Sequence, residues 1–232
     1  MADKSSKKVK SSGPSGVGKL YLLAYNTAQT LGWAYMLLQT LSHFLNRGTL
    51  DTFWPEIAWT VIIFQNAAVL EIVHSLIGLV PSGVAMVLPQ VFSRVFVVCG
   101  CLMATEAGPV SPGLPLCIIA WSITEIIRYA YYTLNLLNSV PQTLLFLRYS
   151  TFLVLYPIGI TGELMCLYFS LDEVAKKQLF TIAMPNPWNF VFNYYYFIVV
   201  YMFSYIPFFP MLFGHMLAQR RKMLGKDAKK TK

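Results

Sequence analysis

Long apolar stretches separated by short polar breaks run through almost the whole chain. A membrane-spanning helix needs about 20 consecutive, mostly apolar residues. The stretches that reach or approach this length are residues 20–44, 55–80, 84–106, 112–137, 143–170 and 188–217. The third is the least regular, because Pro89 and Arg94 interrupt it. The pattern predicts an all-α protein, a polytopic membrane helix bundle with about six transmembrane helices.

The positions of the basic residues predict how the chain is oriented in the membrane. The chain is 56% hydrophobic and 12% charged, and five of its 18 Lys and Arg residues lie in 1–19 and seven in 220–232. Basic residues concentrate on the cytoplasmic side of membrane proteins, so both termini are predicted to be cytosolic. We expect a disordered basic leader over 1–19, a six-span membrane domain over 20–218 and a basic tail over 219–232. Basic charge concentrated at the two ends indicates topology signals and no nucleic-acid partner.

The cysteines indicate neither a disulfide framework nor a metal site. Cys99, Cys101, Cys117 and Cys166 all fall inside predicted spans, and none lies in a predicted luminal loop. We therefore expect free, buried thiols, with no zinc or other metal bound.

Ionisable residues inside the apolar stretches are informative, because each costs about 2.5 to 3.5 kcal/mol to insert at the centre of a membrane helix. Polar pairs three or four residues apart, and so on one helical face, are Glu71 with His74, Gln90 with Arg94, and Glu125 with Arg128. Glu125 and Arg128 are able to neutralise each other, and Glu71 and Arg94 to pair across the bundle. His74 is typical of a hydrogen-bonded core histidine. These residues favour a structural interpretation, in which ion pairs fix the helix register.

The fifth stretch contains YPIGITGE, in which Tyr156 and Glu163 stand seven residues apart. Seven residues make nearly two helical turns, so the phenol and the carboxylate share a face, about 10.5 Å apart along the axis. The same face carries Tyr149, Phe152 and Gly159, and the glycine removes a side chain between the two polar groups. Glu163 has no basic residue three or four positions away. A carboxylate without a local counter-charge in apolar surroundings suits general acid–base chemistry.

Several blocks together resemble one family, the very-long-chain (3R)-3-hydroxyacyl-CoA dehydratases, also called protein-tyrosine-phosphatase-like proteins. The blocks are LEIVHSLIGLVPS, LPQVFSRVF, IAWSITEIIRYAYYTLNLL, LRYSTFLVLYPIGITGE, PNPWNFVFNYYY and SYIPFFPMLFGHMLAQRRKML, in order from about residue 20 to 224. The resemblance implies a six-span enzyme of the endoplasmic reticulum membrane that needs no cofactor. It implies removal of water from a 3-hydroxyacyl-CoA to give the trans-2-enoyl-CoA, the third step of fatty-acid elongation. Implied partners are the condensing enzyme, the ketoacyl reductase and the enoyl reductase of that cycle.

The resemblance also implies which residues are catalytic. The family's tyrosine and glutamate, in a YPxGxxxE pattern, fall on Tyr156 and Glu163. Elimination requires a base for the C2 proton and an acid for the departing 3-hydroxyl. We assign Glu163 as the base and Tyr156 as the acid, with the reverse assignment open. Candidates to bind substrate or support the pair are Gln90, Arg94, Arg148, Tyr149 and Gly159.

Two departures from known patterns and one C-terminal motif complete the comparison. The phosphatase loop HCxxxxxR here has Ser75 after His74 and ends on Pro81, so a thiolate phosphatase is excluded at this site. Asn193 stands where many relatives have an aspartate. The closing KKTK resembles a cytosolic dilysine retrieval signal for the endoplasmic reticulum.

Two other classes of function remain open at this stage. A small multispan transporter would use intramembrane Glu, His and Arg as a proton or substrate path, but the halves of the chain show no repeat. A scaffold for elongation enzymes would not depend on Tyr156 or Glu163.

Overall fold

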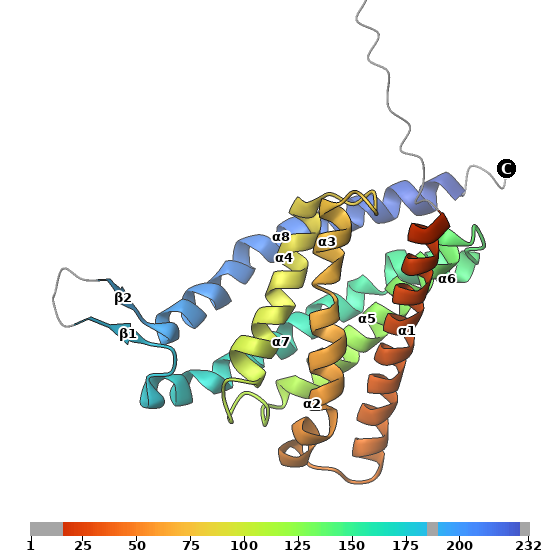
Figure 1. Ribbon diagram of the computed structural model, residues 1–232. Coiled ribbons are helices and arrows are strands. Elements are labelled where there is room, and N and C mark those ends of the chain that lie inside the picture. The colour runs from red at the N-terminus through yellow and green to blue at the C-terminus, as the bar shows by residue number, and fades with distance from the viewer. Residues whose placement is uncertain (1–15, 185–189, 228–232) are drawn as a thin grey trace, which may run out of the picture.

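The computed structural model describes residues 16–184 and 190–227 and is almost entirely helical. Its elements, in order, are α1 (Gly16–Leu45), α2 (Leu50–Ala67), α3 (Leu70–Leu76), α4 (Val84–Val95), the π-helix η1 (Phe96–Leu102), α5 (Gly113–Leu136), α6 (Gln142–Ser150), α7 (Phe152–Lys177), β1 (Ile182–Ala183), β2 (Val191–Phe192) and α8 (Tyr194–Asp227). The long helices lie beside one another in a bundle, with the short strands β1 and β2 projecting at one side (Figure 1).

Within the described residues, four helical segments are long and apolar enough to cross a membrane: Leu50–Leu76, Gly113–Leu136, Phe152–Lys177 and Tyr194–Gly225. Val87–Leu102 is a shorter apolar segment. α1 has 30 residues but is less apolar than these four segments, because its sequence includes more polar side chains. Several of them, such as Gln29, Thr40 and His43, are buried in the bundle. The all-α membrane bundle is thus confirmed, whereas the number of six spans stays a prediction.

Three of the predicted spans depart from single regular helices. The second is divided, because α2 ends at Ala67 and α3 begins at Leu70. The third consists of α4 followed by η1, which ends at Leu102. The fifth is divided, because α6 ends at Ser150 and α7 begins at Phe152. At this junction the Thr151 hydroxyl donates a hydrogen bond to the carbonyl of Leu147 at 2.9 Å, which also accepts the Thr151 N–H at 3.0 Å. One continuous helix over 143–170 was therefore a wrong expectation.

The predicted ends of the chain lie partly outside the described residues. Residues 1–15 of the expected leader and the KKTK motif at 229–232 are not among them. Residues 16–19 form the first turn of α1, and α8 extends through the start of the expected tail to Asp227. The expected luminal loop at 171–187 is helical up to Lys177, because α7 continues that far.

α5 packs closely against both α1 and α7. Between α5 and α7 the backbones approach at Gly113 and Gly162. A Cβ added to Gly162 would lie 2.6 Å from the Gly113 carbonyl oxygen and 2.6 Å from the Cys117 nitrogen. Small residues permit this approach between membrane helices. Since Gly162 immediately precedes Glu163, the approach also brings that carboxylate against α5.

Candidate active site

Glu163 is buried in the middle of the bundle and is held from two sides. Its side chain lies on α7, and the residue is only 6% exposed. The indole nitrogen of Trp121, on α5, donates a hydrogen bond to Oε1 at 2.8 Å. The hydroxyl of Tyr205, on α8, donates to Oε2 at 2.7 Å. Both carboxylate oxygens thus have a donor, and no ion pair among the described residues includes Glu163.

A second phenol extends this arrangement toward α4. The hydroxyls of Tyr201 and Tyr205 are 3.2 Å apart, and Tyr201 donates to the Ser93 carbonyl at 3.3 Å. Each hydroxyl has one proton and accepts others. When Glu163 is ionised, Tyr205 donates to it. When Glu163 is protonated, the carboxyl is able to donate to Tyr205, Tyr205 to Tyr201, and Tyr201 to Ser93. The two phenols are therefore able to keep Glu163 hydrogen-bonded in both charge states.

Tyr156 lies on the same helix as Glu163, as the sequence predicted. α7 is continuous through both residues, which places them about 10.5 Å apart along its axis. The half-buried ring of Tyr156 stacks on Phe209 of α8, with ring centroids 5.3 Å apart and planes 8° from parallel. Residues 205 and 209 are four apart on α8, so α8 contacts Glu163 and Tyr156 with successive turns. The two side chains share no hydrogen bond.

The rest of the predicted stripe is arranged differently. Tyr149 lies on α6 and packs edge-on against Tyr131 of α5, with centroids 6.3 Å apart, so the structure does not place it beside Glu163. Gly159 faces α5, where an added Cβ would meet Ala120 and Trp121 at 3.6 Å or more. Its small size therefore permits contact between α5 and α7, and its expected role between the phenol and the carboxylate stays a prediction.

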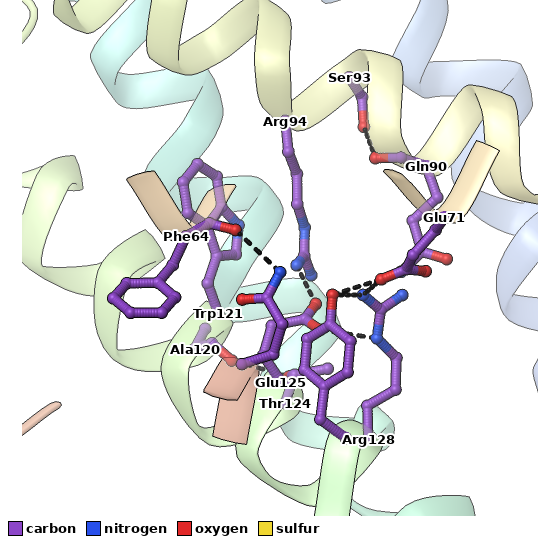
Figure 2. A network of polar contacts seen from close by, with 12 residues as sticks. Phe64, Glu71, Gln90, Ser93, Arg94, Ala120, Trp121, Thr124, Glu125 and Arg128 are labelled. Carbon is purple, nitrogen blue, oxygen red and sulfur yellow. Dashed lines mark hydrogen bonds and ion pairs between the residues drawn. The ribbon is translucent and has the colours of Figure 1, made fainter. Parts of the chain in front are cut away.

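A buried network of ion pairs lies next to this site. Figure 2 shows Arg94 directed at Glu125, and Arg128 placed between Glu125 and Glu71. Arg128 Nε lies 2.6 Å from Glu125 and Arg128 Nη2 lies 2.7 Å from Glu71. The hydroxyl of Tyr129 also donates to Glu71. The Glu125–Arg128 pair is confirmed, but a Glu71–Arg94 pair was a wrong expectation.

The network is connected to Glu163 through Trp121. The Arg94 guanidinium lies 5.5 Å from the centre of the Trp121 ring, whose N–H bonds the carboxylate. Among the predicted supporting residues, Arg94 thus lies near Glu163, and its guanidinium forms an ion pair with Glu125. Gln90 is exposed and lines a cavity of about 10 Å³ together with Arg94, room for about one water molecule.

Arg148 occupies a different position, near the end of α6. Its guanidinium lies 5.7 Å from the ring centre of Tyr132 and donates to that hydroxyl at 3.5 Å. It contacts neither Tyr156 nor Glu163 through a hydrogen bond. Arg220 of α8 donates to the Ser150 hydroxyl at 3.3 Å, so two arginines gather at this end of α6.

His74 and the cysteines have structural surroundings. His74 is buried, and its Nε2 lies 2.9 Å from the Tyr21 hydroxyl, as expected for a hydrogen-bonded core histidine. The cysteines are free thiols, but Cys99 is exposed, contrary to the expectation that all would be buried. Over residues 16–184 and 190–227 no cluster of three or more His, Cys, Asp or Glu side chains could hold a metal ion.

The sequence reasoning missed Trp121, Tyr201 and Tyr205. Tyr201 and Tyr205 are four residues apart, which places both on one face of α8. Trp121 precedes Glu125 by four residues and shares its face of α5. These spacings were visible, but only the fold shows that both faces meet Glu163.

The comparison with family models decides the relationship. The model described as "Protein tyrosine phosphatase-like protein, PTPLA" matches residues 65–226. The chain belongs to this family. The resemblance seen in the sequence motifs is therefore confirmed. The match covers the whole site: the ion-pair network, Tyr156, Glu163 and both phenols of α8 lie inside it, whereas α1 lies outside.

Relatives of this PTPLA protein share most of its length. A mouse protein named very-long-chain (3R)-3-hydroxyacyl-CoA dehydratase 2 is 41% identical over 216 residues, 93% of this chain and 85% of its own. The dehydratase hpo-8 of Caenorhabditis elegans is 42% identical over 211 residues, 90% of this chain and 97% of its own. The rice dehydratase PASTICCINO 2A is 39% identical over 213 residues, 91% of this chain and 96% of its own. No solved structure matches.

Proposed function

We propose that this protein is a hydro-lyase that converts (3R)-3-hydroxyacyl-CoA to trans-2-enoyl-CoA, the third step of very-long-chain fatty-acid elongation. The observation that carries the proposal is the buried Glu163 carboxylate, held by two donors without a counter-charge, on the same helix face as Tyr156. The names of the relatives supply the reaction, and this geometry supplies groups that suit it.

In the proposed mechanism, the C2–C3 bond of the substrate lies between Tyr156 and Glu163. Glu163 takes the C2 proton, the electrons of the C2–H bond form the C2=C3 double bond, and the C3–O bond breaks. Tyr156 gives its phenolic proton to the departing oxygen, which leaves as water. The proton on Glu163 then restores the phenol, so the enzyme returns to its starting state with no cofactor. Arg94 is the nearest cation for negative charge developing on the thioester oxygen.

The location proposed for this reaction follows from the apolar surface and the basic ends. Large apolar side chains such as Trp59, Val200 and Phe203 are exposed on the helices, as in a bundle surrounded by lipid. We infer an endoplasmic reticulum membrane protein with both termini in the cytosol, a basic leader, a basic tail and six spans. Condensing enzyme, ketoacyl reductase and enoyl reductase are the proposed partners, because they make the substrate and use the product.

Direct assay of the purified protein tests the proposal. Full-length protein in lipid nanodiscs is incubated with a long-chain (3R)-3-hydroxyacyl-CoA, and enoyl-CoA is measured. We expect turnover by the wild type and by Glu106→Gln, a matched control because Glu106 is exposed. A wild-type protein that is folded and inactive in this assay would contradict the proposed function and favour a scaffold.

A further inference from the structure

A cavity of about 180 Å³ lies between α1, α3 and α5, apart from Glu163. The start of α1, α3 and the end of α5 supply its lining, and they lie at the end of the bundle where α6 and the last turns of α8 also lie (Figure 1). An empty space of about 150 Å³ in a protein core is able to hold benzene, so this cavity has room for a segment of a larger ligand. Its lining combines apolar residues such as Leu22 and Val80 with the polar Asn26, His74 and Tyr132.

Two buried polar groups of the lining lack partners among the described residues. Asn26 is 6% exposed, and its side-chain amide takes part in none of their hydrogen bonds. His74 is 3% exposed; its Nε2 is bonded to Tyr21, whereas its Nδ1 has no partner. The unpaired atoms of both side chains are not among the fully buried ones, so a ligand in the cavity is able to bond them. The nearby charge of Glu71 is already compensated by Arg128. The lining therefore suits a neutral ligand group that both donates and accepts hydrogen bonds, such as an amide.

The guanidinium of Arg148 lies beside the cavity. Tyr132 lines the cavity and carries the Arg148 guanidinium 5.7 Å from its ring centre. No ion pair of the described residues includes Arg148. Guanidinium groups without a carboxylate partner are well suited to phosphate. A ligand with an amide and an adjacent phosphate matches both features.

One face of α5 connects the cavity with Glu163. Trp121, Glu125, Arg128 and Tyr132 follow one another at helical spacing on that face. Tyr132 lines the cavity, and Trp121 donates to Glu163. Eleven residues separate them, about 16 Å along the axis. A ligand that reaches from the cavity to the carboxylate must therefore be long and narrow.

We propose that this cavity binds the phosphopantetheine arm of the acyl-CoA substrate. Asn26 bonds the amide of the arm that lies farther from the sulfur, Arg148 meets a phosphate, and the thioester extends along α5 toward Glu163. The inference rests on the proposed function, because it assigns a site to one part of the proposed substrate.

Three thioesters of the same 3-hydroxyacyl chain test this assignment in nanodiscs. The CoA ester has the phosphates and both amides, the pantetheine ester lacks the phosphates, and the N-acetylcysteamine ester keeps only the amide nearest the sulfur. Asn26→Leu should raise KM about three- to tenfold for the CoA and pantetheine esters, the loss of one hydrogen bond, and leave the N-acetylcysteamine ester unchanged. Arg148→Gln should raise KM for the CoA ester alone.

Asn46→Leu is the matched control, since Asn46 follows the far end of α1 and is exposed. Asn26→Ala repeats the test should the leucine variant fail to fold. An equal effect of the Asn26 variants on all three esters, or no effect on any, would overturn the assignment. Loss of wild-type turnover with every ester would instead contradict the proposed function.

Discussion

At the scale of single residues, Glu163 and Tyr156 are expected to separate the two halves of the elimination. Glu163→Gln keeps the shape of the side chain but removes the basic oxygen, and Tyr156→Phe keeps the ring stacked on Phe209 but removes the acidic hydroxyl. Each change should lower kcat about 10²- to 10⁴-fold with the protein still folded. Exchange of the substrate's C2 proton with solvent assigns the roles. A Tyr156→Phe enzyme that exchanges this proton without losing water supports Glu163 as the base; exchange that depends on Tyr156 reverses the assignment.

The phenols of α8 lead to a graded prediction. Tyr205→Phe removes a donor to the Glu163 carboxylate, and one hydrogen bond to a charged group corresponds to about a tenfold to hundredfold loss in kcat/KM. Tyr201→Phe should cost less, because Tyr201 acts only through Tyr205. For the same reason the double variant should match Tyr205→Phe. Tyr196→Phe, an exposed position on α8, is the control. If the loss of kcat/KM in the double variant equalled the product of the two single losses, Tyr201 and Tyr205 would act independently, which would contradict the prediction.

At the scale of helices, the close approach of α5 and α7 determines where Glu163 lies. Gly162→Ala would place a Cβ 2.6 Å from backbone atoms of α5, so the helices must separate. Overpacking of this kind costs about 1 to 3 kcal/mol, and backbone contacts leave little room to relax. We expect a lower thermal midpoint in detergent and reduced activity. Gly214→Ala, on α8 with open space around it, should retain both. An unchanged midpoint for Gly162→Ala would mean that the helices shift without cost.

The apolar pattern predicted the helices well, because whether a run of apolar residues is buried in lipid or protein depends on the residues of that run alone. The spacing of Tyr156 and Glu163 likewise predicted a shared face, since both lie on one helix. The sequence did not predict which side chains meet between helices. Tyr205 reaches Glu163 only because α8 packs against α7. Arg94 of α4 pairs with Glu125 of α5 and not with Glu71, which pairs with Arg128. The break at Thr151 follows the polar residues Arg148 and Ser150, which the fifth predicted span included without an interruption.

At the scale of the whole molecule, the orientation in the membrane decides from which side an acyl-CoA reaches the site. The start of α1 and the end of α8 lie at the same end of the bundle (Figure 1), as an even number of crossings requires. The basic residues at both ends of the chain favour the cytosolic side for that end. The cavity beside Arg148 is lined by residues near the start of α1, at this same end, which suits the proposed substrate with a charged, water-soluble CoA group.

Protease protection in sealed microsomes tests this orientation. An epitope tag at either terminus should be digested without detergent, because both ends are expected in the cytosol. A tag inserted at Thr181, between α7 and β1, should be protected until detergent opens the membrane. The inserted tag is the essential comparison, since it lies at the opposite end of α7 from Phe152 and distinguishes crossing from mere association with the surface. Digestion of the Thr181 tag in intact microsomes would mean that fewer crossings separate it from the N-terminus than we expect. Protection of one terminus alone would mean that the total number of crossings is odd. The CoA group would then have to approach Glu163 from the other end of the bundle.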